Sequence, residues 1–305
     1  MKAFQLLNYP GSKLRLLPEI QQRIDRSKKA LIEPFLGGAS VMLNLSSFHE
    51  QWCGDIIPYV VRALQIITGE EPAFERAKDW LIRLQQERVI VPPPDILRRL
   101  RKGDSSLEPS VIAPYKKAYY DYRSTWNEER HDNCNDTVAM GFLFLAGGCV
   151  NNLVRFGRTG DFNQGWGARS FNVENLDKAR SALKGRRVHL YVSSFEQVLT
   201  DSYHVWPDAF VYLDPPYGGR TEAATNGLYG LNTAWTAEHD ARLADFCHRI
   251  HDRGGKFLLS NLRENERLIK ALQDKFIVEE LPHIKYKASV GRHEARKQTE
   301  VFVRN

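Results

Sequence analysis

The tetrapeptide Asp214-Pro215-Pro216-Tyr217 carries side chains that could hold a flat molecule with an amino group. It follows an apolar run at residues 210–213 that predicts a short buried strand. Two consecutive prolines fix φ and remove two backbone donors, so the Asp214 carboxylate and the Pro215 carbonyl form a rigid pair of acceptors. The pair can accept both hydrogens of an exocyclic amine, while the Tyr217 ring offers a face for stacking. This pattern predicts a binding site at the carboxyl edge of an α/β sheet.

Such a site could prepare an amine for methylation. The lone pair of an adenine amine is delocalised into the ring, which makes the nitrogen a poor nucleophile. Two acceptors that draw on its hydrogens favour a pyramidal nitrogen whose lone pair can attack a methyl group, and no strong base is required. The alternative is an ordinary turn, because aspartate and proline are common turn residues. The buried strand before the tetrapeptide favours the site.

The elements that must position this site are typical of an α/β sheet. A strand at 30–33 precedes a glycine loop at 34–40 and a helix from 41, the order used to bind nucleotide-like cofactors. A second strand at 51–54 ends in Asp55, about twenty residues after the loop, where a carboxylate can accept bonds from both ribose hydroxyls. Neither a dinucleotide fingerprint nor a phosphate loop is present. The pattern therefore indicates an adenosyl ligand without phosphates.

A tight polar turn at residues 8–13 precedes an amphipathic helix at 14–24. Its Lys13 and Tyr9 could hold a carboxylate and a flat ring, or the turn could be an ordinary solvated helix cap. Further strands are expected at 188–192 and 256–260, followed by an antiparallel pair at 277–284 and 299–303. Residues 218–235 lack apolar periodicity, which predicts a mobile lid or a substrate-binding loop.

From residue 56 to about 184 the pattern changes to helices and loops, as if a mostly helical domain had been inserted into the α/β one. Its most apolar helix, 138–150, is expected to form the core of the insert. A glycine-punctuated hairpin at 151–163 follows and carries arginines, amides and aromatics. Arg and Asn side chains read base edges and aromatics can wedge between bases, so the hairpin indicates DNA reading. A solvated hairpin with paired arginines is the alternative.

Positive charge gathers in two places. The formal net charge of +6 and the pI of about 9.1 permit a polyanionic partner. Arg98, Arg99, Arg101 and Lys102 crowd beside a linker punctuated by proline and glycine. A basic loop with one aromatic at 285–297 favours nucleic-acid binding.

Composition excludes other classes of protein. The 305 residues suffice for one large or two modest domains. The four cysteines form no Cys-x-x-Cys pair, which argues against a zinc ribbon and a disulfide scaffold and favours a reducing compartment. Residues 1–13 lack a signal-peptide core, and no run approaches the roughly 20 apolar residues of a membrane span. We therefore expect a cytoplasmic protein with no membrane partner and no metal.

Taken together, these motifs resemble the DNA adenine methyltransferase (Dam) family, which transfers a methyl group from S-adenosylmethionine to the 6-amino group of adenine. The resemblance spans nearly the whole chain in the family's order. Residues 9–13 match the family's N-terminal cofactor motif, 33–38 its glycine motif and Asp55 its ribose acid. Residues 155–163 match the target-reading hairpin, 214–217 the catalytic tetrapeptide and 259–261 the late strand.

The resemblance implies a Rossmann-like S-adenosylmethionine-dependent methyltransferase sheet with an inserted, mostly helical target-recognition domain. Residues 1–57 and 185–305 would form the catalytic domain, and residues 58–184 the inserted one. Such an enzyme would work as a monomer or weak dimer on double-stranded DNA and methylate a flipped-out adenine. It would belong to a bacterium or a phage-infected cell, either within a restriction-modification system or as an orphan methylase.

The same resemblance assigns roles residue by residue. Catalysis would involve Asp214, Pro215, Pro216 and Tyr217. Cofactor binding would involve Tyr9, Gly11, Lys13, Glu33, Pro34, Phe35, Gly37, Gly38, Asp55, Ser194, Phe195 and Asp214. DNA binding would involve Asn8, Asn151, Leu153, Arg155, Arg158, Arg169, Lys285, Lys287 and Arg292.

Three positions depart from family members that methylate GATC. Val150 stands where they carry a tyrosine that wedges into the duplex, Asn8 where they carry a lysine near a guanine, and Arg169 where they carry another tyrosine. The resemblance therefore supports the chemistry better than any target sequence, and GATC is not implied. Two alternatives stay open: an acceptor other than DNA adenine, namely RNA adenine or the cytosine amine, and a DNA-binding module that has lost catalysis.

Overall fold

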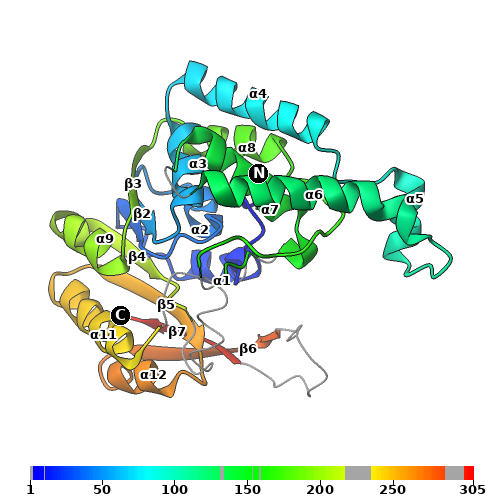
Figure 1. Cartoon of the computed structure of the whole chain (residues 1–305). Helices are drawn as coiled ribbons and strands as arrows, with labels where there is room; N and C mark the ends of the chain where they lie inside the picture. Colours follow the sequence, from blue (N-terminus) through cyan, green and yellow to red (C-terminus); the bar gives the residue numbers. More distant parts are fainter. Residues whose placement is uncertain are drawn as a thin grey trace.

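A seven-stranded sheet lies at the centre of the computed structural model, in the order β3-β2-β1-β4-β5-β7-β6 (Figure 1). Strands β1 to β5 run parallel, and β7 is antiparallel to both β5 and β6. The predicted Rossmann-like α/β fold is confirmed. The structure describes residues 3–9, 11–130, 134–152, 154–157, 159–216, 235–285 and 299–305. The strands are β1 Ala30–Glu33, β2 Glu50–Asp55, β3 Arg187–Val192, β4 Ala209–Leu213, β5 Lys256–Leu262, β6 Ile277–Lys285 and β7 Thr299–Arg304.

Both faces of the sheet are covered, which explains why the central strands read as continuous apolar runs. On one face, Leu31 and Phe210 pack with residues of α1 (Leu17–Gln22) and α2 (Ser40–Asn44). On the other face, Ile32 and Val211 pack beneath three helices (Figure 1). These helices are α9 Phe195–Asp201, α11 Ala237–Asp252 and α12 Glu266–Leu272.

A helical layer is formed by the chain between β2 and β3. It comprises α3 Pro58–Thr68, α4 Glu71–Glu87, α5 Pro94–Arg101, α6 Pro109–Glu129, α7 Asp136–Gly148 and α8 Glu174–Leu183. Helix α7 is buried along almost its whole length, as its apolar sequence predicts. The cluster around it also includes Met42 and Cys53, so the helical layer and the sheet share one continuous core. The proposed domain boundaries at residues 57 and 184 stay a prediction.

Helix boundaries follow local signals. Helices α3, α5 and α6 begin with Pro58, Pro94 and Pro109, whose missing N–H is not needed in the first turn. The Asn135 side chain accepts a hydrogen bond from the Val138 amide at 2.9 Å and caps α7. The side chains of Thr236 and His239 form a capping box at the start of α11.

Parts of two predicted segments lie outside the described residues: the proposed lid, apart from Trp235, and the basic loop beyond residue 285. The described residues contain no helix with the length and apolarity needed to cross a bilayer.

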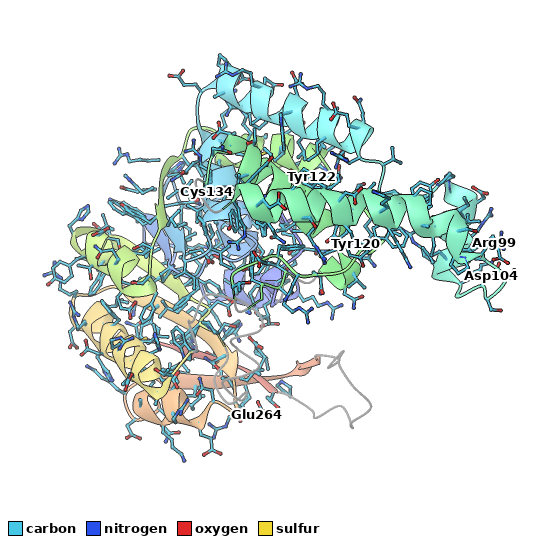
Figure 2. The ribbon with its side chains drawn as sticks, viewed as in Figure 1. Arg99, Asp104, Tyr120, Tyr122, Cys134 and Glu264 are labelled. Atoms are coloured by element: carbon cyan, nitrogen blue, oxygen red, sulfur yellow. The ribbon has the colours of Figure 1, made fainter. Side chains whose placement is uncertain are left out.

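Gly141 of α7 lies directly against α6, which carries Tyr120 and Tyr122 (Figure 2). A Cβ at this position would overlap the Tyr122 hydroxyl and lie 2.8 Å from Trp126 Cδ1. Gly141→Ala should therefore lower the free energy of unfolding by about 1–3 kcal/mol, measured by urea denaturation. The matched control is Gly165→Ala, whose Cβ would lie 3.5 Å from the Tyr120 hydroxyl. Equal losses in the two variants would contradict the packing described here.

Candidate active site

Three acidic side chains meet at the carboxyl edge of the parallel strands. Glu33 ends β1, Asp55 ends β2 and Asp214 follows β4. Side chains alternate along a strand, and each of these three residues lies two positions after one that faces the α2 side of the sheet. The charges of Asp214 and Asp55 both raise the pKa of Glu33, so both carboxyl groups lie close enough to Glu33 to act on it. The structure therefore brings together acids that are 22 or more residues apart in the sequence.

A buried lysine pairs with one of these acids. The Lys13 ammonium lies 2.7 Å from Asp214 Oδ1 and also donates to the Gly11 carbonyl at 2.8 Å. The Lys13 amide donates to the Ser40 hydroxyl at 3.3 Å, which attaches the N-terminal turn to α2. Burial raises the pKa of Asp214 to about 6, and Lys13 opposes that rise. Asp214 is therefore largely ionised above neutral pH.

The other two acids are held by backbone amides. Glu33 is buried, and its Oε2 accepts from the Met42 amide at 2.8 Å; burial is the largest cause of its strongly raised pKa. Asp55 accepts from the amides of Gly37 and Ile57 at 2.8 and 2.9 Å. Burial raises the pKa of Asp55, while hydrogen bonds from the amides of Ile57, Gly37 and Ile56 lower it. A carboxylate offers about four lone-pair sites, so Asp55 keeps capacity for a further donor.

The glycine loop approaches the N-terminal turn closely. Gly37 has a φ of +49°, a conformation that favours glycine. A Cβ at Gly38 would lie 2.6 Å from the Leu7 carbonyl oxygen and 2.9 Å from Tyr9 Cβ. The predicted residues Tyr9, Gly37 and Gly38 are thus brought together. Pro34, at the start of the same loop, is buried.

Aromatic rings gather on the opposite face of the same edge. Phe35 and Phe195 stack with their ring centroids 5.2 Å apart. Trp235 lies 5.7 Å from Phe35 and 5.5 Å from Phe195, and its Nε1 donates to Asp240 Oδ1 at 2.8 Å. Sequence reasoning missed Trp235 as a site residue; its signal was an aromatic directly before the cap of α11. The exposed Ser194 side chain accepts from the Gln197 amide at 3.4 Å, so it caps α9.

Ser260 and Asn261, near the end of β5, and Glu300 of β7 were not assigned to the site from the sequence. The Ser260 hydroxyl donates to Glu300 Oε1 at 2.5 Å, and the Glu300 charge raises the pKa of Asp214. Asn261 is buried; its Oδ1 accepts from the Leu262 amide at 2.8 Å, whereas its Nδ2 finds no acceptor among the described residues. Leaving such a donor unpaired costs about 1–3 kcal/mol. No local pattern marks Glu300, because only the pairing of β7 with β5 brings it here.

The predicted hairpin is confirmed. Phe156 and Phe162 form an antiparallel bridge, and the Gly157 amide donates to the Asp161 carbonyl at 2.7 Å. Both phenylalanines are buried against the helical core, so the expectation that they could wedge between bases is wrong. Arg155 points the other way because side chains alternate. It is exposed, and its Nε donates to Asn163 Oδ1 at 2.8 Å.

A polar stripe on α6 holds this hairpin. Asn127 forms two hydrogen bonds with the Phe162 backbone: its Nδ2 donates to the carbonyl at 3.1 Å and its Oδ1 accepts from the amide at 2.8 Å. Arg123 donates to the Gln164 carbonyl at 3.0 Å, and Arg130 donates to Asp161 Oδ1 at 2.6 Å. Sequence reasoning missed all three, although their spacing of i, i+4 and i+7 places them on one helix face.

The remaining predicted residues are exposed or lie outside the described residues. Asn8, Asn151 and Arg169 are exposed. Gly11 and Asn151 have φ values of +79° and +56°. Lys285 ends β6 opposite Thr299, and its side chain is not described. The predicted residues outside the described ranges are Leu153, Arg158, Tyr217, Lys287 and Arg292.

Comparison with known proteins adds a consistent finding. A family model described as D12 class N6 adenine-specific DNA methyltransferase matches residues 9–290. The type II methyltransferase M.MjaIII of Methanocaldococcus jannaschii is 28% identical over 86% of this chain and 85% of its own length. The DNA adenine methylases of Vibrio cholerae and Escherichia coli K12 are 25% and 24% identical over 84% of this chain and 80% and 79% of their own lengths. The matched range includes the three acids, the aromatic rings and the hairpin.

The raised pKa of Asp214 has a measurable effect on stability. Because this pKa is about 6 in the folded protein and 3.8 ordinarily, the folded state binds the proton more tightly than the unfolded chain does. The stability that depends on this proton is fully present below about pH 4 and is lost as the pH rises through about 6. Asp214→Asn removes this titration and also leaves the Lys13 ammonium without its carboxylate, a cost that does not depend on the Asp214 proton. The free energy of unfolding of the variant relative to wild type should therefore rise by about 1–3 kcal/mol between about pH 4 and pH 8.

Urea denaturation across this pH range measures the effect. Asp252→Asn is the control, because the pKa of Asp252 is shifted in the opposite direction: a hydrogen bond from Lys275 lowers it. That variant should gain no stability near pH 8. A difference in stability between Asp214→Asn and wild type that does not change with pH would contradict the raised pKa of Asp214.

Proposed function

The chain belongs to the D12 class N6 adenine-specific DNA methyltransferase family, and from that membership we propose how its residues divide the reaction. The edge of the sheet at Asp214 is the transfer site, S-adenosylmethionine is the methyl donor, and an adenine swung out of double-stranded DNA is the acceptor. The observation that carries the proposal is the Lys13–Asp214 ion pair beside Glu33 and Asp55.

The residues at this edge fit S-adenosylmethionine, which supplies an electrophilic methyl group on a positively charged sulfur. Asp55 has acceptor capacity for ribose hydroxyls, and Phe35 and Phe195 offer apolar ring surface for an adenine. The carboxylates favour a cationic donor and lose part of that attraction once its charge is gone. Asp214 and Asp55 thus favour the donor over the spent product.

Lys13 acts chiefly on Asp214. The sequence allowed Lys13 to hold a carboxylate, and the carboxylate that it pairs with is Asp214 of the same protein. Burial alone would push the pKa of Asp214 higher, and the lysine charge opposes this. Lys13 therefore keeps Asp214 ionised at neutral pH and fixes the direction of its carboxylate.

Asp214 and the Pro215 carbonyl then orient the acceptor amine. A hydrogen bond to the ionised carboxylate is worth about 1.5–3 kcal/mol, which is comparable to the few kcal/mol that unstacking a base costs. The amino nitrogen gains the methyl group and loses one proton. Asp214, with a pKa of about 6, can accept that proton and pass it to water. Stacking on Tyr217 stays a prediction from the sequence.

The helical layer supplies DNA recognition in this proposal. The hairpin buries its phenylalanines and presents Arg155 outward, where an arginine can read a guanine. Asn151 and Arg169 are also exposed. The Val150 amide donates to the Gly165 carbonyl at 2.8 Å, which joins the two segments that carry these residues. We propose residues 58–184 as the target-recognition domain of a monomer or weak dimer.

Transfer of a radiolabelled methyl group tests the function. Purified protein would be given labelled S-adenosylmethionine with duplex DNA or RNA, and the product digested to nucleosides. Label in N6-methyladenine from DNA supports the proposal, while label in cytosine, in RNA alone or in no nucleoside overturns it. Methylation-sensitive sequencing of DNA from expressing cells would then give the target sequence.

Removal of the Asp214 carboxylate should stop transfer. Asp214→Ala is expected to lower turnover at least 100-fold, about the effect of losing one well-placed electrostatic or acid–base group, while the protein still binds DNA. Asp214→Asn should retain part of the activity, because an amide carbonyl is also an acceptor. Labelled transfer and a DNA-binding assay measure the two properties. Near wild-type turnover in Asp214→Ala would remove the mechanism.

Loosening the hairpin should affect DNA recognition more than chemistry. Asn127→Ala removes both hydrogen bonds to the Phe162 backbone, worth about 1–2 kcal/mol. We expect the KM for DNA to rise about 5- to 30-fold, with turnover at saturating DNA and the affinity for S-adenosylmethionine little changed. Thr125→Ala on the exposed side of α6 is the matched control. Equal KM values in the two variants would contradict a positioning role for Asn127.

A further inference from the structure

Helix α5 forms an arm that projects from the helical layer. Figure 1 shows it beyond the end of α6 that points away from the sheet. None of its eight residues is buried, and only Ile112 is buried in the first ten residues of α6. We call α5 and the turn that follows it, residues 94–108, the α5 arm. A segment that packs so little against its own protein contributes little to the core.

The arm carries a stripe of unpaired positive charge. Arg98, Arg101 and Lys102 are exposed, and their spacing of i, i+3 and i+4 places them on one helix face. In the described part of the chain, none of the three pairs with a carboxylate. Arg99 differs, because it donates to Asp104 at 2.8 Å at the tip of the arm (Figure 2).

The half-buried side chains of α5 lie away from this stripe, at Ile96, Leu97 and Leu100. The sequence therefore divides the short helix into an apolar face and a basic face. A partner that matches the basic face must offer closely spaced negative charge on its surface. The phosphates of a nucleic-acid strand, which advance about 3.4 Å along the axis per nucleotide, meet this requirement. The stripe spans about 6 Å along α5, enough for about two of them.

One continuous helix connects the arm to the hairpin. Along α6, Asn127 and Arg123 bind the hairpin backbone, and the Lys116 ammonium lies 5.7 Å from the centre of the Trp166 ring. These contacts fix the direction of α6 relative to the hairpin. The 14 helical steps from Pro109 to Arg123 extend about 21 Å, which is about six base pairs of duplex.

We propose that the α5 arm binds the DNA backbone outside the recognition site, up to about six base pairs from the hairpin contacts. The inference rests on the proposed function, because it takes DNA as the substrate. The arm reads no sequence in this role. Arg98, Arg101 and Lys102 neutralise flanking phosphates and hold the duplex in the direction set by α6.

Salt-dependent binding to duplexes of two lengths tests this role. Both duplexes carry the methylated site found by sequencing; one extends about three base pairs beyond it on each side and the other about twelve. Fluorescence anisotropy would give Kd between about 50 and 200 mM NaCl. The wild-type protein should bind the long duplex more tightly and with the steeper salt dependence. In Arg98→Ala/Arg101→Ala, the slope of log K against log salt for the long duplex should fall by about 1.8, or 0.9 per lost phosphate contact.

The matched control removes the same charge elsewhere. Arg76 and Arg83 are exposed on α4, on a different side of the helical layer from the arm (Figure 1). Arg76→Ala/Arg83→Ala should leave the long-to-short ratio of affinities at its wild-type value. The proposal would be overturned if Arg98→Ala/Arg101→Ala kept the wild-type long-to-short ratio of affinities. It would also be overturned if both double variants lost affinity for the long duplex equally. Failure of labelled methyl transfer by the wild-type protein would instead overturn the proposed function.

Discussion

The ion pair between Lys13 and Asp214 is the interaction on which the rest of the site depends. Asp214 is placed beside Glu33 and Asp55 at the end of the sheet, where burial and like charge disfavour another carboxylate. Lys13 offsets that cost and joins the N-terminal turn to the residue that follows β4, 201 residues later in the chain. The Lys13 amide and Gly38 then set the spacing of the turn from α2 and the glycine loop. Removal of either partner would leave the charge of the other buried and uncompensated.

The same edge separates two kinds of chemistry by strand alternation. Acids at the ends of β1 and β2 and after β4 lie toward the α2 face, while Phe35, Phe195 and Trp235 pack together with the core of the α9 and α11 face. A ligand with one charged and one flat apolar part therefore has a complementary surface on each side. This division, more than any single residue, is what makes an adenosyl sulfonium a fitting donor for the proposed reaction.

Much of the sheet was predictable, and so was the place of Asp214 at its edge. Strand β1 is a short apolar run that ends in an acid, β2 is a short buried strand that also ends in one, and the period of their side chains depends only on local geometry. The capped start of α11 and the buried character of α7 followed from equally local signals. The hairpin was also expected, but the burial of Phe156 and Phe162 was not. The alternation of apolar and polar side chains along the hairpin shows that one of its faces is buried, but it does not show which part of the protein covers that face.

The sequence by itself determined the strands, their acidic ends and the proline-bounded acceptor pair, because these depend on residues close together in the chain. Only the tertiary structure decided that Lys13 pairs with Asp214, that Glu300 arrives beside it through β7, and that α6 clasps the hairpin through Asn127. These contacts join segments whose patterns carry no information about one another. Their partners are selected by how the sheet and the helical layer pack into one core, which is a property of the whole chain.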